Sequence, residues 1–350
     1  MCRWTTRWRT SCEMAGFDPS PRCACNSKFT PACSLGSLPD RLLLPPTRAP
    51  NHEQAGVSPP TGFSVVIASF RDAEVLRQCV GSLRPQCEAL GAELIVVRAA
   101  RESAEQLREL TAGCRVEPAL ADDDIPRLRG RGLAAATGEW VAVTEDHCVA
   151  DAGWLAALIA AAGPGADVLG GAMGNAHHAR RTDCGAFFSE YGFFGAGPVA
   201  PSRPGPPLVT GANVAYHRRI VADVAAWALS GDWENVIHDR LHASGRTFRL
   251  VPDARVRQNL HYALGAFAVD RFEHGRDFAA TRARSLPAWR RMIFAAATPA
   301  LPLVLARRIA RAVDPAERPH FGRALPATLA FLAAWAAGEA TGYLFGHARA

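Results

Sequence analysis

Short apolar runs alternate with amphipathic stretches between residues 63 and 162, and this alternation constrains the fold more than any other feature. After the first run, apolar side chains recur at Leu76, Cys79, Val80 and Leu83, which is the spacing of one helix face. The runs that read as buried strands are at 63–68, 94–97 and 139–144. Strands that alternate with helices of about ten or more residues predict βαβ units. The expected fold class is therefore α/β, with a mainly parallel sheet flanked by helices.

Polar residues follow each of the three predicted strands. Residues 69–72 come after the first strand, Arg98 comes after the second, and residues 145–147 come after the third. In open sheets of this kind, ligands bind beyond the carboxyl ends of the strands. We therefore expect these three clusters to line one binding site.

The second half of the chain is less regular, but two of its segments bear on a site. Residues 208–216 contain Gly211, which allows another group to approach the backbone closely, so this segment could line the site. A helix is predicted from Trp233 to about Ser244, where Gly245 ends it. Glu234, at the start of this helix, could serve the site or could simply stabilise the positive end of the helix.

Composition and periodicity divide the chain into three parts. Hydrophobic residues make up 49% of the chain, which excludes a wholly disordered protein. Residues 1–60 are a low-complexity mixture without periodicity and are predicted to be disordered, residues 61–265 carry the α/β domain, and residues 266–350 form a basic, apolar tail. The ten cysteines include no Cys-x-x-Cys pair, which disfavours a zinc site.

The tail predicts contact with a membrane. Its 12 basic and 6 acidic side chains accompany two apolar stretches, 292–306 and 324–346. A helix over the first stretch reaches about 22 Å, short of the roughly 30 Å hydrocarbon core, so we expect an interfacial or re-entrant element there. The second stretch is long enough to span, so the tail is expected to form basic interfacial helices and a C-terminal membrane helix or hairpin. The arginines between the two stretches place their loop on the cytoplasmic side. The alternative is a pair of buried core helices.

Five stretches, taken in their order along the chain, resemble the family 2 glycosyltransferases of the GT-A fold. They correspond to the family's first βα unit, the helix that enters its metal-site strand, its acidic motif, its acceptor-side segment and its catalytic helix. The five stretches are 64–83, 130–141, 145–155, 210–219 and 233–245. The resemblance covers most of residues 63–262 and implies a GT-A-type sheet.

The resemblance implies inverting transfer of a sugar from a nucleotide-sugar donor to a hydroxyl of a glycan or lipid-linked acceptor of the cell envelope. It assigns Glu234 as the base for that hydroxyl, and Glu145 and His147 as ligands of a divalent cation, Mn²⁺ or Mg²⁺. The residues it implies in donor binding are Ser69, Phe70, Arg71, Arg98, Glu145, Asp146, Gly211 and Asn213. The basic surplus lies on the apolar tail, so we expect a membrane surface as partner and no nucleic acid. The catalytic domain would then lie on the cytoplasmic side of the cell membrane.

Four positions depart from the family pattern. Arg71 stands where the family usually has Asn, and Arg98 stands where it usually has Asp. His147 replaces a metal-binding Asp, and Trp233 replaces the first acid of the catalytic pair. These departures keep two alternatives open. One is a nucleotidyltransferase of the same fold, which would leave a nucleoside monophosphate on its product, and the other is a catalytically inert, membrane-bound scaffold.

Overall fold

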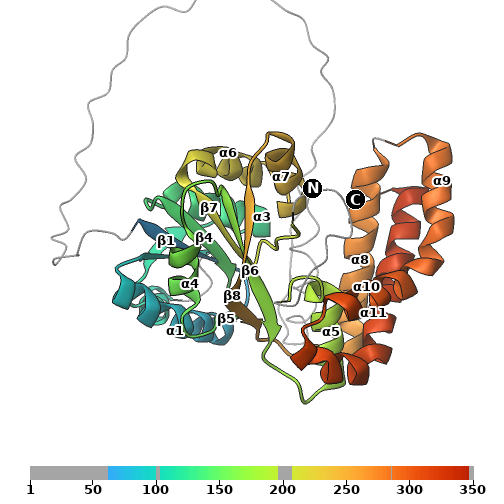
Figure 1. Cartoon of the computed structure of the whole chain (residues 1–350), viewed down its shortest axis with the longest axis horizontal. Coiled ribbons are helices and arrows are strands. Elements are labelled where there is room, and N and C mark those ends of the chain that lie inside the picture. Colours follow the sequence, from blue (N-terminus) through green and yellow to red (C-terminus); the bar gives the residue numbers. More distant parts are fainter. Residues whose placement is uncertain (1–61, 100–102, 196–206, 285, 347–350) are drawn as a thin grey trace, which may run out of the picture. The chain divides into compact units, whose positions relative to one another are not determined.

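A computed structural model describes residues 62–99, 103–195, 207–284 and 286–346. The predicted disorder of residues 1–60 lies outside the described residues. Within them, eight strands form one sheet in the order β3-β2-β1-β4-β7-β6-β8-β5, with helices on both faces (Figure 1). Among the pairings of these strands, four are parallel and three are antiparallel. The predicted α/β class, with a sheet flanked by helices, is confirmed.

The first half of the domain has the predicted βαβ order. β1 (Phe63–Ser69), β2 (Glu93–Arg98) and β4 (Trp140–Glu145) coincide with the three apolar runs, and β3 (Arg115–Pro118) adds a parallel strand at the edge. The helices between them are α1 (Ala73–Leu90), α2 (Ala104–Leu110) and α3 (Ile125–Ala135). α1 buries the apolar face that its sequence predicts, so the periodicity alone located this helix correctly.

The second half turns the sheet into a mixed one. β7 (Asn213–His217) is antiparallel to β4 and to β6 (Val168–Asn175). β8 (Phe248–Gln258) is parallel to β6 and antiparallel to β5 (Cys148–Ala150). The helices of this half are α4 (Trp154–Ala161), α5 (Arg181–Tyr191), α6 (Arg218–Leu229) and α7 (Glu234–Ala243). The parallel arrangement therefore belongs to β1–β4, where the βαβ pattern is clear in the sequence.

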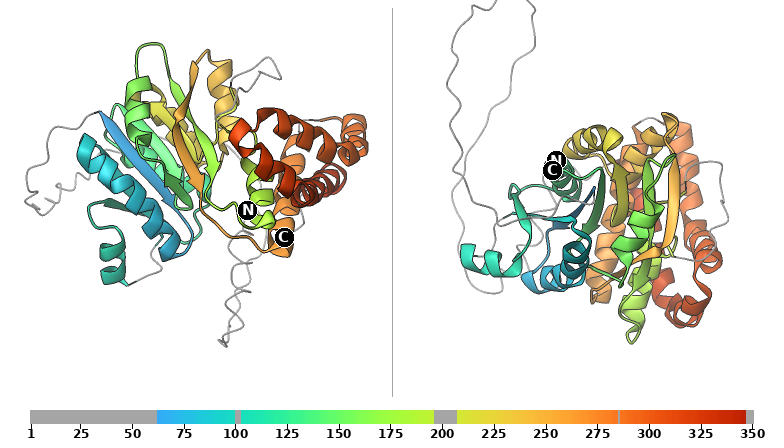
Figure 2. Two further views of the ribbon diagram at one scale, coloured as in Figure 1. Left: turned by 60° about the horizontal axis from the view of Figure 1, so that its bottom comes forward. Right: turned by 60° about the vertical axis from the view of Figure 1, so that its left-hand side comes forward.

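β1 is buried along its whole length because both faces of the sheet are covered. Val65 and Ile67 lie in the core cluster that includes α1 and α4, whereas Val66 and Ala68 lie in the cluster that includes α3 and α6. Figure 2 shows the sheet between these helical layers. A strand covered on both faces reads as a continuous apolar run rather than an alternating one.

The strand register brings the predicted polar clusters to one edge of the sheet. Ser69 at the end of β1 pairs with Arg98 at the end of β2. Ala68 pairs with Glu145 at the end of β4. Because the three strands are parallel, their carboxyl ends meet, and the residues that follow them face a common space.

The C-terminal part of the described chain is helical. Its main helices are α8 (Leu264–Ala283), α9 (Ala288–Ala297), α10 (Leu301–Ala312) and α11 (Arg318–Phe345). α11 packs along α8 with the two backbones in contact. A Cβ added to Gly275 would lie 2.2 Å from the Trp335 carbonyl oxygen, and a Cβ added to Gly338 would lie 2.0 Å from the Phe272 carbonyl oxygen. Glycine is therefore required where the helices cross.

The second apolar stretch of the tail does not have the place that the sequence suggested. α11, which contains residues 324–345 of this stretch, packs against α8 and α5 and buries Thr328 and Phe331. Among the described residues, the helix long and apolar enough to cross a membrane is instead Ala288–Ala312, which contains α9, a 3-10 turn and α10. The assignment of the membrane helix to 324–346 is corrected accordingly: hydropathy measured the apolar content of both stretches, but only packing decides which one is covered by protein.

Candidate active site

Asp146 holds the loop that follows β1. Its Oδ2 accepts hydrogen bonds from the backbone N–H groups of Phe70 and Arg71, both at 2.7 Å, and from the Ser69 hydroxyl at 3.1 Å. Burial raises the pKa of Asp146 above its ordinary value. Its Oδ1 is buried and has no hydrogen-bond partner. Asp146 therefore fixes the predicted donor-binding loop and keeps one oxygen unused.

Arg98 supports the same loop from β2. Its Nη1 donates to the Ser69 hydroxyl at 2.6 Å and to the Arg71 carbonyl oxygen at 2.8 Å. Arg98 and Ser69 are both buried. The structure thus brings these two predicted site residues together as supports of the loop that carries Phe70 and Arg71.

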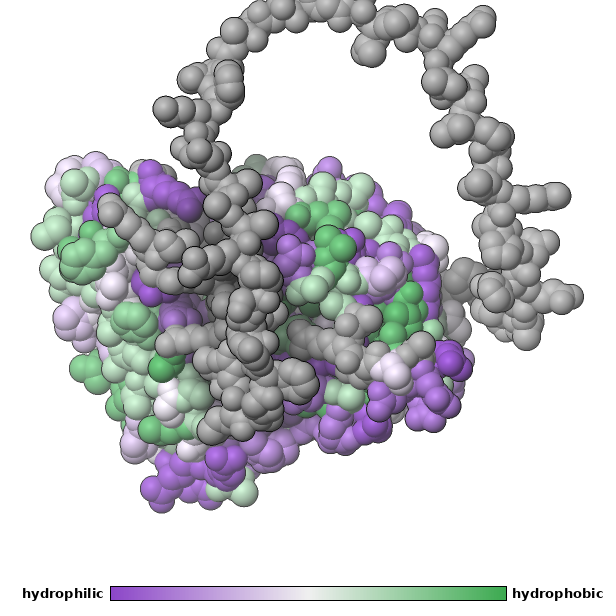
Figure 3. All heavy atoms as spheres, turned by 180° about the vertical axis from the view of Figure 1, so that it is seen from behind, coloured by the Kyte–Doolittle hydropathy of each residue, from purple (hydrophilic) through white to green (hydrophobic). Residues whose placement is uncertain are grey.

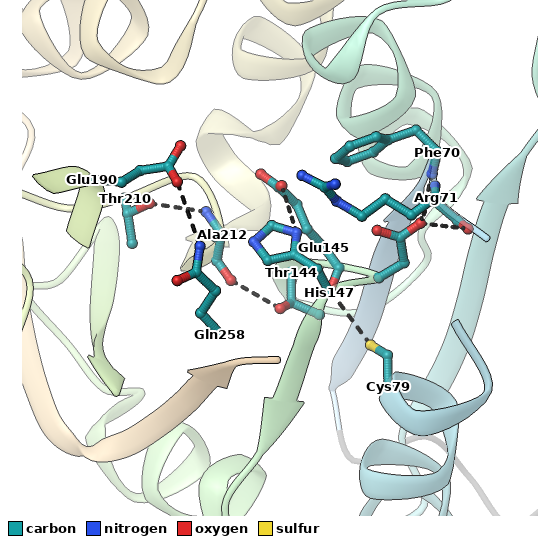
Figure 4. Close-up of polar contacts among 12 residues, drawn as sticks. Phe70, Arg71, Cys79, Thr144, Glu145, His147, Glu190, Thr210, Ala212 and Gln258 are labelled. Carbon is teal, nitrogen blue, oxygen red and sulfur yellow. Dashed lines mark hydrogen bonds and ion pairs between the residues drawn. The ribbon is translucent and has the colours of Figure 1, made fainter. Parts of the chain in front are cut away.

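Arg71 points toward the acidic end of β4 (Figure 4). Its guanidinium lies over the ring of Phe70, with Cζ 5.0 Å from the ring centroid. Its Nε is buried without a hydrogen-bond partner. Burial acts to lower the pKa of Arg71, but Tyr262, Asp146 and Glu145 outweigh it and raise this pKa. Arg71 therefore carries a fixed positive charge into the site.

Arg129, on α3, joins two carboxylates that lie far apart in the sequence. Its Nη2 donates to Glu145 Oε1 at the end of β4, and its Nη1 donates to Glu234 Oε2 at the start of α7 at 2.8 Å. Gly211 makes room for this guanidinium, because a Cβ added there would lie 2.2 Å from Arg129 Nη1. The close approach predicted at Gly211 exists, and the group that approaches is Arg129.

The ion pairs set the ionisation of the site. Burial acts to raise the pKa of Glu234, but Arg129 outweighs it and holds this pKa below its ordinary value. Burial acts to lower the pKa of Arg129, but Glu234 and Glu145 outweigh it and raise this pKa. Glu234 is therefore an ionised carboxylate at neutral pH, as a group that accepts a proton must be.

His147 lies between Glu145 and α5. Its Nδ1 is 3.3 Å from Glu145 Oε2, and its Nε2 is 3.3 Å from the Tyr191 hydroxyl oxygen. Burial lowers the pKa of His147 to about 4, so the imidazole is neutral at pH 7. A neutral imidazole retains a nitrogen lone pair that can bind a metal.

The donor set at Glu145 and His147 fits a shared metal site rather than a complete protein cage. No group of three or more His, Cys, Asp or Glu side chains in the described parts of the chain could hold a metal ion. Glu145 and His147 nevertheless offer a carboxylate and a neutral imidazole, and His147 Nδ1 is buried without a hydrogen-bond partner. Mg²⁺ commonly binds through one or two protein ligands and takes its other ligands from substrate phosphates.

Asn213 pairs with Thr144 across the sheet, and its side chain bonds within the core. Its amide nitrogen donates to the carbonyl oxygens of Ala172 and Ala254, both at 2.9 Å, and its oxygen accepts from the Trp154 indole at 2.9 Å. These contacts join β6, β7 and β8 beneath the site. The Asn213 side chain therefore has a structural role, and the donor contact that the family resemblance implies for it stays a prediction.

Two buried histidines predict a stability that decreases in acid. Burial lowers the pKa of both His147 and His238 to about 4, and His238 Nε2 lies 2.8 Å from the Tyr216 hydroxyl oxygen. The unfolded chain binds these protons near the ordinary pKa of about 6.5, so unfolding is favoured as the pH falls from there toward 4. Between about pH 7.5 and about pH 5.5, each histidine should reduce the free energy of unfolding by about 1 kcal/mol.

Urea denaturation at the two pH values measures this loss. His238→Gln, which can still bond to Tyr216, should lessen the pH dependence by about 1 kcal/mol. An unchanged pH dependence in His238→Gln would show that His238 is already protonated in the folded protein.

Residues 64–221 match the protein family described as glycosyl transferase family 2. The match covers 158 of the 350 residues, and this segment is similar to the family 2 glycosyltransferases. The match runs from β1 into α6, so it includes the loop after β1, Arg129 and the acidic end of β4, while Glu234 lies beyond it. The resemblance found in the sequence is confirmed.

The chain is also similar to solved structures. One is the mannosyltransferase PcManGT from Pyrobaculum calidifontis in complex with GDP-Man and Mn²⁺, at 16% identity over 81% of this chain and 88% of that chain, with a TM-score of 0.47. Another is glucosyl-3-phosphoglycerate synthase from Mycobacterium tuberculosis in complex with Mn²⁺, UDP and phosphoglyceric acid, at 16% identity over 59% of this chain and 73% of that chain, with a TM-score of 0.40. No curated protein matches the chain.

Proposed function

We propose that this domain moves a sugar from a nucleotide-sugar donor to a hydroxyl acceptor, a glycan or a lipid-linked molecule of the cell envelope, with inversion at the anomeric carbon. The observation that carries the proposal is the Arg129 bridge between Glu145 and Glu234. It joins the acidic end of a parallel strand, where a donor would bind, to a half-buried and ionised carboxylate that can accept a proton. Both belong to the same site.

In the proposed reaction, the acceptor oxygen attacks the anomeric carbon and the bond from that carbon to the diphosphate oxygen breaks. Glu234 takes the proton from the attacking hydroxyl, and the nucleoside diphosphate leaves with the bonding electron pair. The guanidinium groups of Arg71 and Arg129 offset the negative charge that develops on the leaving group. Their positions are fixed before the donor arrives, so little reorganisation is needed during the reaction.

A divalent cation is part of the proposal. Glu145 and His147 would hold it, for the reasons given above. When bound, such a cation supplies charge neutralisation for the departing diphosphate. The imidazole of His147 suits Mn²⁺ better than Mg²⁺, because nitrogen ligands favour the transition metal.

The identity of the leaving group separates this proposal from the nucleotidyltransferase alternative. The full-length protein is incubated with nucleotide sugars and a panel of hydroxyl acceptors, and ³¹P and ¹H NMR follow the products. The proposal predicts a free nucleoside diphosphate and a glycoside of inverted anomeric configuration. A nucleoside monophosphate attached to the product would contradict glycosyl transfer and support the nucleotidyltransferase alternative.

We also propose that α9 and α10 bind a membrane surface. α9 has no buried residue, and Trp289, Met292 and Leu303 are 59, 60 and 70% exposed. Figure 3 shows apolar side chains on the surface formed by the C-terminal helices. The arginines among them are Arg290, Arg291, Arg307, Arg308 and Arg311. Apolar side chains beside cationic ones match the acyl boundary and the anionic headgroups of a lipid surface.

The packing of α10 favours an interfacial position over a membrane span. Ala306, Ile309 and Ala312 are buried against the rest of the domain, so this half of the helix is covered by protein. The 3-10 turn Thr298–Ala300 separates α9 from α10. The exposed apolar residues therefore form a surface element, in agreement with the interfacial reading of 292–306.

Removal of the exposed apolar side chains should strongly weaken membrane binding. In the triple variant Trp289→Ser, Met292→Ser and Ile293→Ser, we expect affinity for vesicles containing anionic lipid to fall about a hundredfold, because each of the three side chains loses on the order of 1 kcal/mol of burial. Vesicle flotation measures the effect. The control is Leu120→Ser, which removes a 58% exposed side chain outside these helices. Equal flotation of the triple variant and the control would contradict the proposal.

A further inference from the structure

A second polar cluster lies on the α5 side of His147. Glu190 precedes Tyr191, whose hydroxyl contacts His147, and the carboxylate of Glu190 faces Gln258 at the end of β8. Gln258 Nε2 lies 3.4 Å from Glu190 Oε2 and donates to the Tyr262 hydroxyl at 2.6 Å. Figure 4 shows Glu190 and Gln258 beside His147 and Glu145. The cluster is therefore continuous with the site at the end of β4.

Arg271 of α8 completes the cluster. It is buried, and its guanidinium lies 4.4 Å from the centroid of the Trp335 ring. Its Nη1 is 4.0 Å from Glu190 Oε1, and its Nε is buried without a hydrogen-bond partner. A buried donor that stays unpaired costs about 1–3 kcal/mol, and more when the group is charged. A ligand atom that accepted a hydrogen bond from Arg271 Nε would remove this cost, so the position favours ligand binding.

The Glu190–Arg271 pair has a looser geometry than the structural ion pairs of this protein. Arg257 and Asp151 form a two-point pair at 2.6 and 2.9 Å. Among the described residues, by contrast, Gln258 Nε2 and Arg271 Nη1 approach the Glu190 carboxylate at 3.4 and 4.0 Å. Burial raises the pKa of Glu190 and lowers the pKa of Arg271, since neither group recovers its hydration through a close partner. The pair leaves room for hydrogen bonds to a third molecule.

We infer that Glu190, Gln258, Tyr262 and Arg271 form the acceptor subsite, and that this subsite takes an uncharged sugar ring. The inference rests on the proposed glycosyl transfer. A carboxylate accepts hydrogen bonds, a guanidinium donates them and a tyrosine hydroxyl can do both, so the cluster can bind a sugar hydroxyl either as a donor or as an acceptor. One negative and one positive side chain give no net charge, which suits a neutral polyol. The cluster lies beside β8 and α8 and next to Arg71 of the donor loop, whose charge interacts with Tyr262 and Glu190.

The test separates acceptor binding from donor chemistry. Full-length protein and its Glu190→Gln variant are compared with methyl glycosides of glucose, galactose, mannose and N-acetylglucosamine as probes. Saturation-transfer NMR in the presence of UDP or GDP measures binding, and release of nucleotide into water measures donor chemistry alone. We expect the variant to bind the preferred glycoside at least tenfold more weakly, with a matching rise in acceptor KM, and to retain the wild-type rate of release into water.

The control is Glu317→Gln, a half-buried carboxylate that contacts His178 outside the cluster. It should bind the glycosides as the wild type does. Failure of every glycoside to bind the wild type, tighter binding of glucose 6-phosphate than of any neutral probe, or unchanged binding in Glu190→Gln would each overturn the inference. Wild-type protein that binds a glycoside but releases no nucleotide from any donor would instead refute the proposed transfer and leave the sugar site standing. A parallel loss of release into water would assign Glu190 to the donor reaction and also overturn the inference.

Discussion

The variant Glu234→Gln is expected to lose about 10²–10⁴-fold in kcat, because the proposed reaction then lacks the group that takes the acceptor proton. Glutamine has the shape of glutamate and can still accept a hydrogen bond from Arg129 through its amide oxygen. The loss should therefore appear in kcat, with donor binding preserved. Steady-state kinetics of nucleoside diphosphate release, together with a thermal unfolding profile, measures both properties.

The matched control for Glu234→Gln is Asp232→Asn. Asp232 lies two residues earlier and pairs with Arg240 on the exposed side of α7. It should retain wild-type activity. If Glu234→Gln works as fast as Asp232→Asn, Glu234 is not the base, and its role reduces to the ion pair that it forms with Arg129.

The variant Arg129→Met should lose both activity and stability. It leaves Glu145 and Glu234 facing each other without the cation between them, and removing one partner of a buried ion pair costs about 3–5 kcal/mol. With Arg129 absent, burial and the facing charge of Glu145 raise the pKa of Glu234 in the folded state above the unfolded value. The variant should therefore be least stable at neutral pH and should recover stability as the pH falls toward 5.

A double variant tests this explanation of the Arg129 effect. Arg129→Met combined with Glu234→Gln removes one of the two facing charges, so its free energy of unfolding at pH 7 should exceed that of Arg129→Met alone. Urea denaturation of the four proteins of this cycle gives the coupling between the two residues. If the two losses simply add, Arg129 stabilises the protein by packing rather than by holding the carboxylates together.

The sequence predicted the elements whose pattern is local. β1, β2 and β4 are continuous apolar runs, and α1 shows one apolar face, so their type and order followed from periodicity. Parallel order then placed residues 69–72, Arg98 and 145–147 at one edge of the sheet, where the structure has them.

Residues whose partners are distant in sequence could not be assigned in this way. In the sequence, Arg129 looks like any other arginine of a polar helix. Only the folded chain brings Glu145 to its Nη2 and Glu234 to its Nη1. The one local hint was its position beside Gly130, in the segment that resembled the family. Asn213 was expected at the donor from the family resemblance, and the partners of its side chain in β6, β8 and α4 could not be predicted from the sequence.

In the tail, hydropathy could not predict which apolar helix is covered by protein. Both apolar stretches have the composition of membrane-contacting helices, and neither records in its own sequence what covers it. α11 is covered because Gly338 and Gly275 let it approach α8 at backbone distance. α9 has no such partner among the described residues, and its apolar side chains remain exposed.

Release of nucleotide from a panel of UDP- and GDP-sugars tests the central claim most directly, namely that the Arg129-bridged carboxylates form a glycosyltransferase active site. The full-length protein is assayed with Mn²⁺, with Mg²⁺ and with a chelator, beside Glu234→Gln and Asp232→Asn. The account predicts nucleoside diphosphate release from a preferred donor, faster with a divalent cation, intact in Asp232→Asn and lost in Glu234→Gln. An absence of release from every donor, with no saturable binding of any of them, would contradict it and favour the inert scaffold.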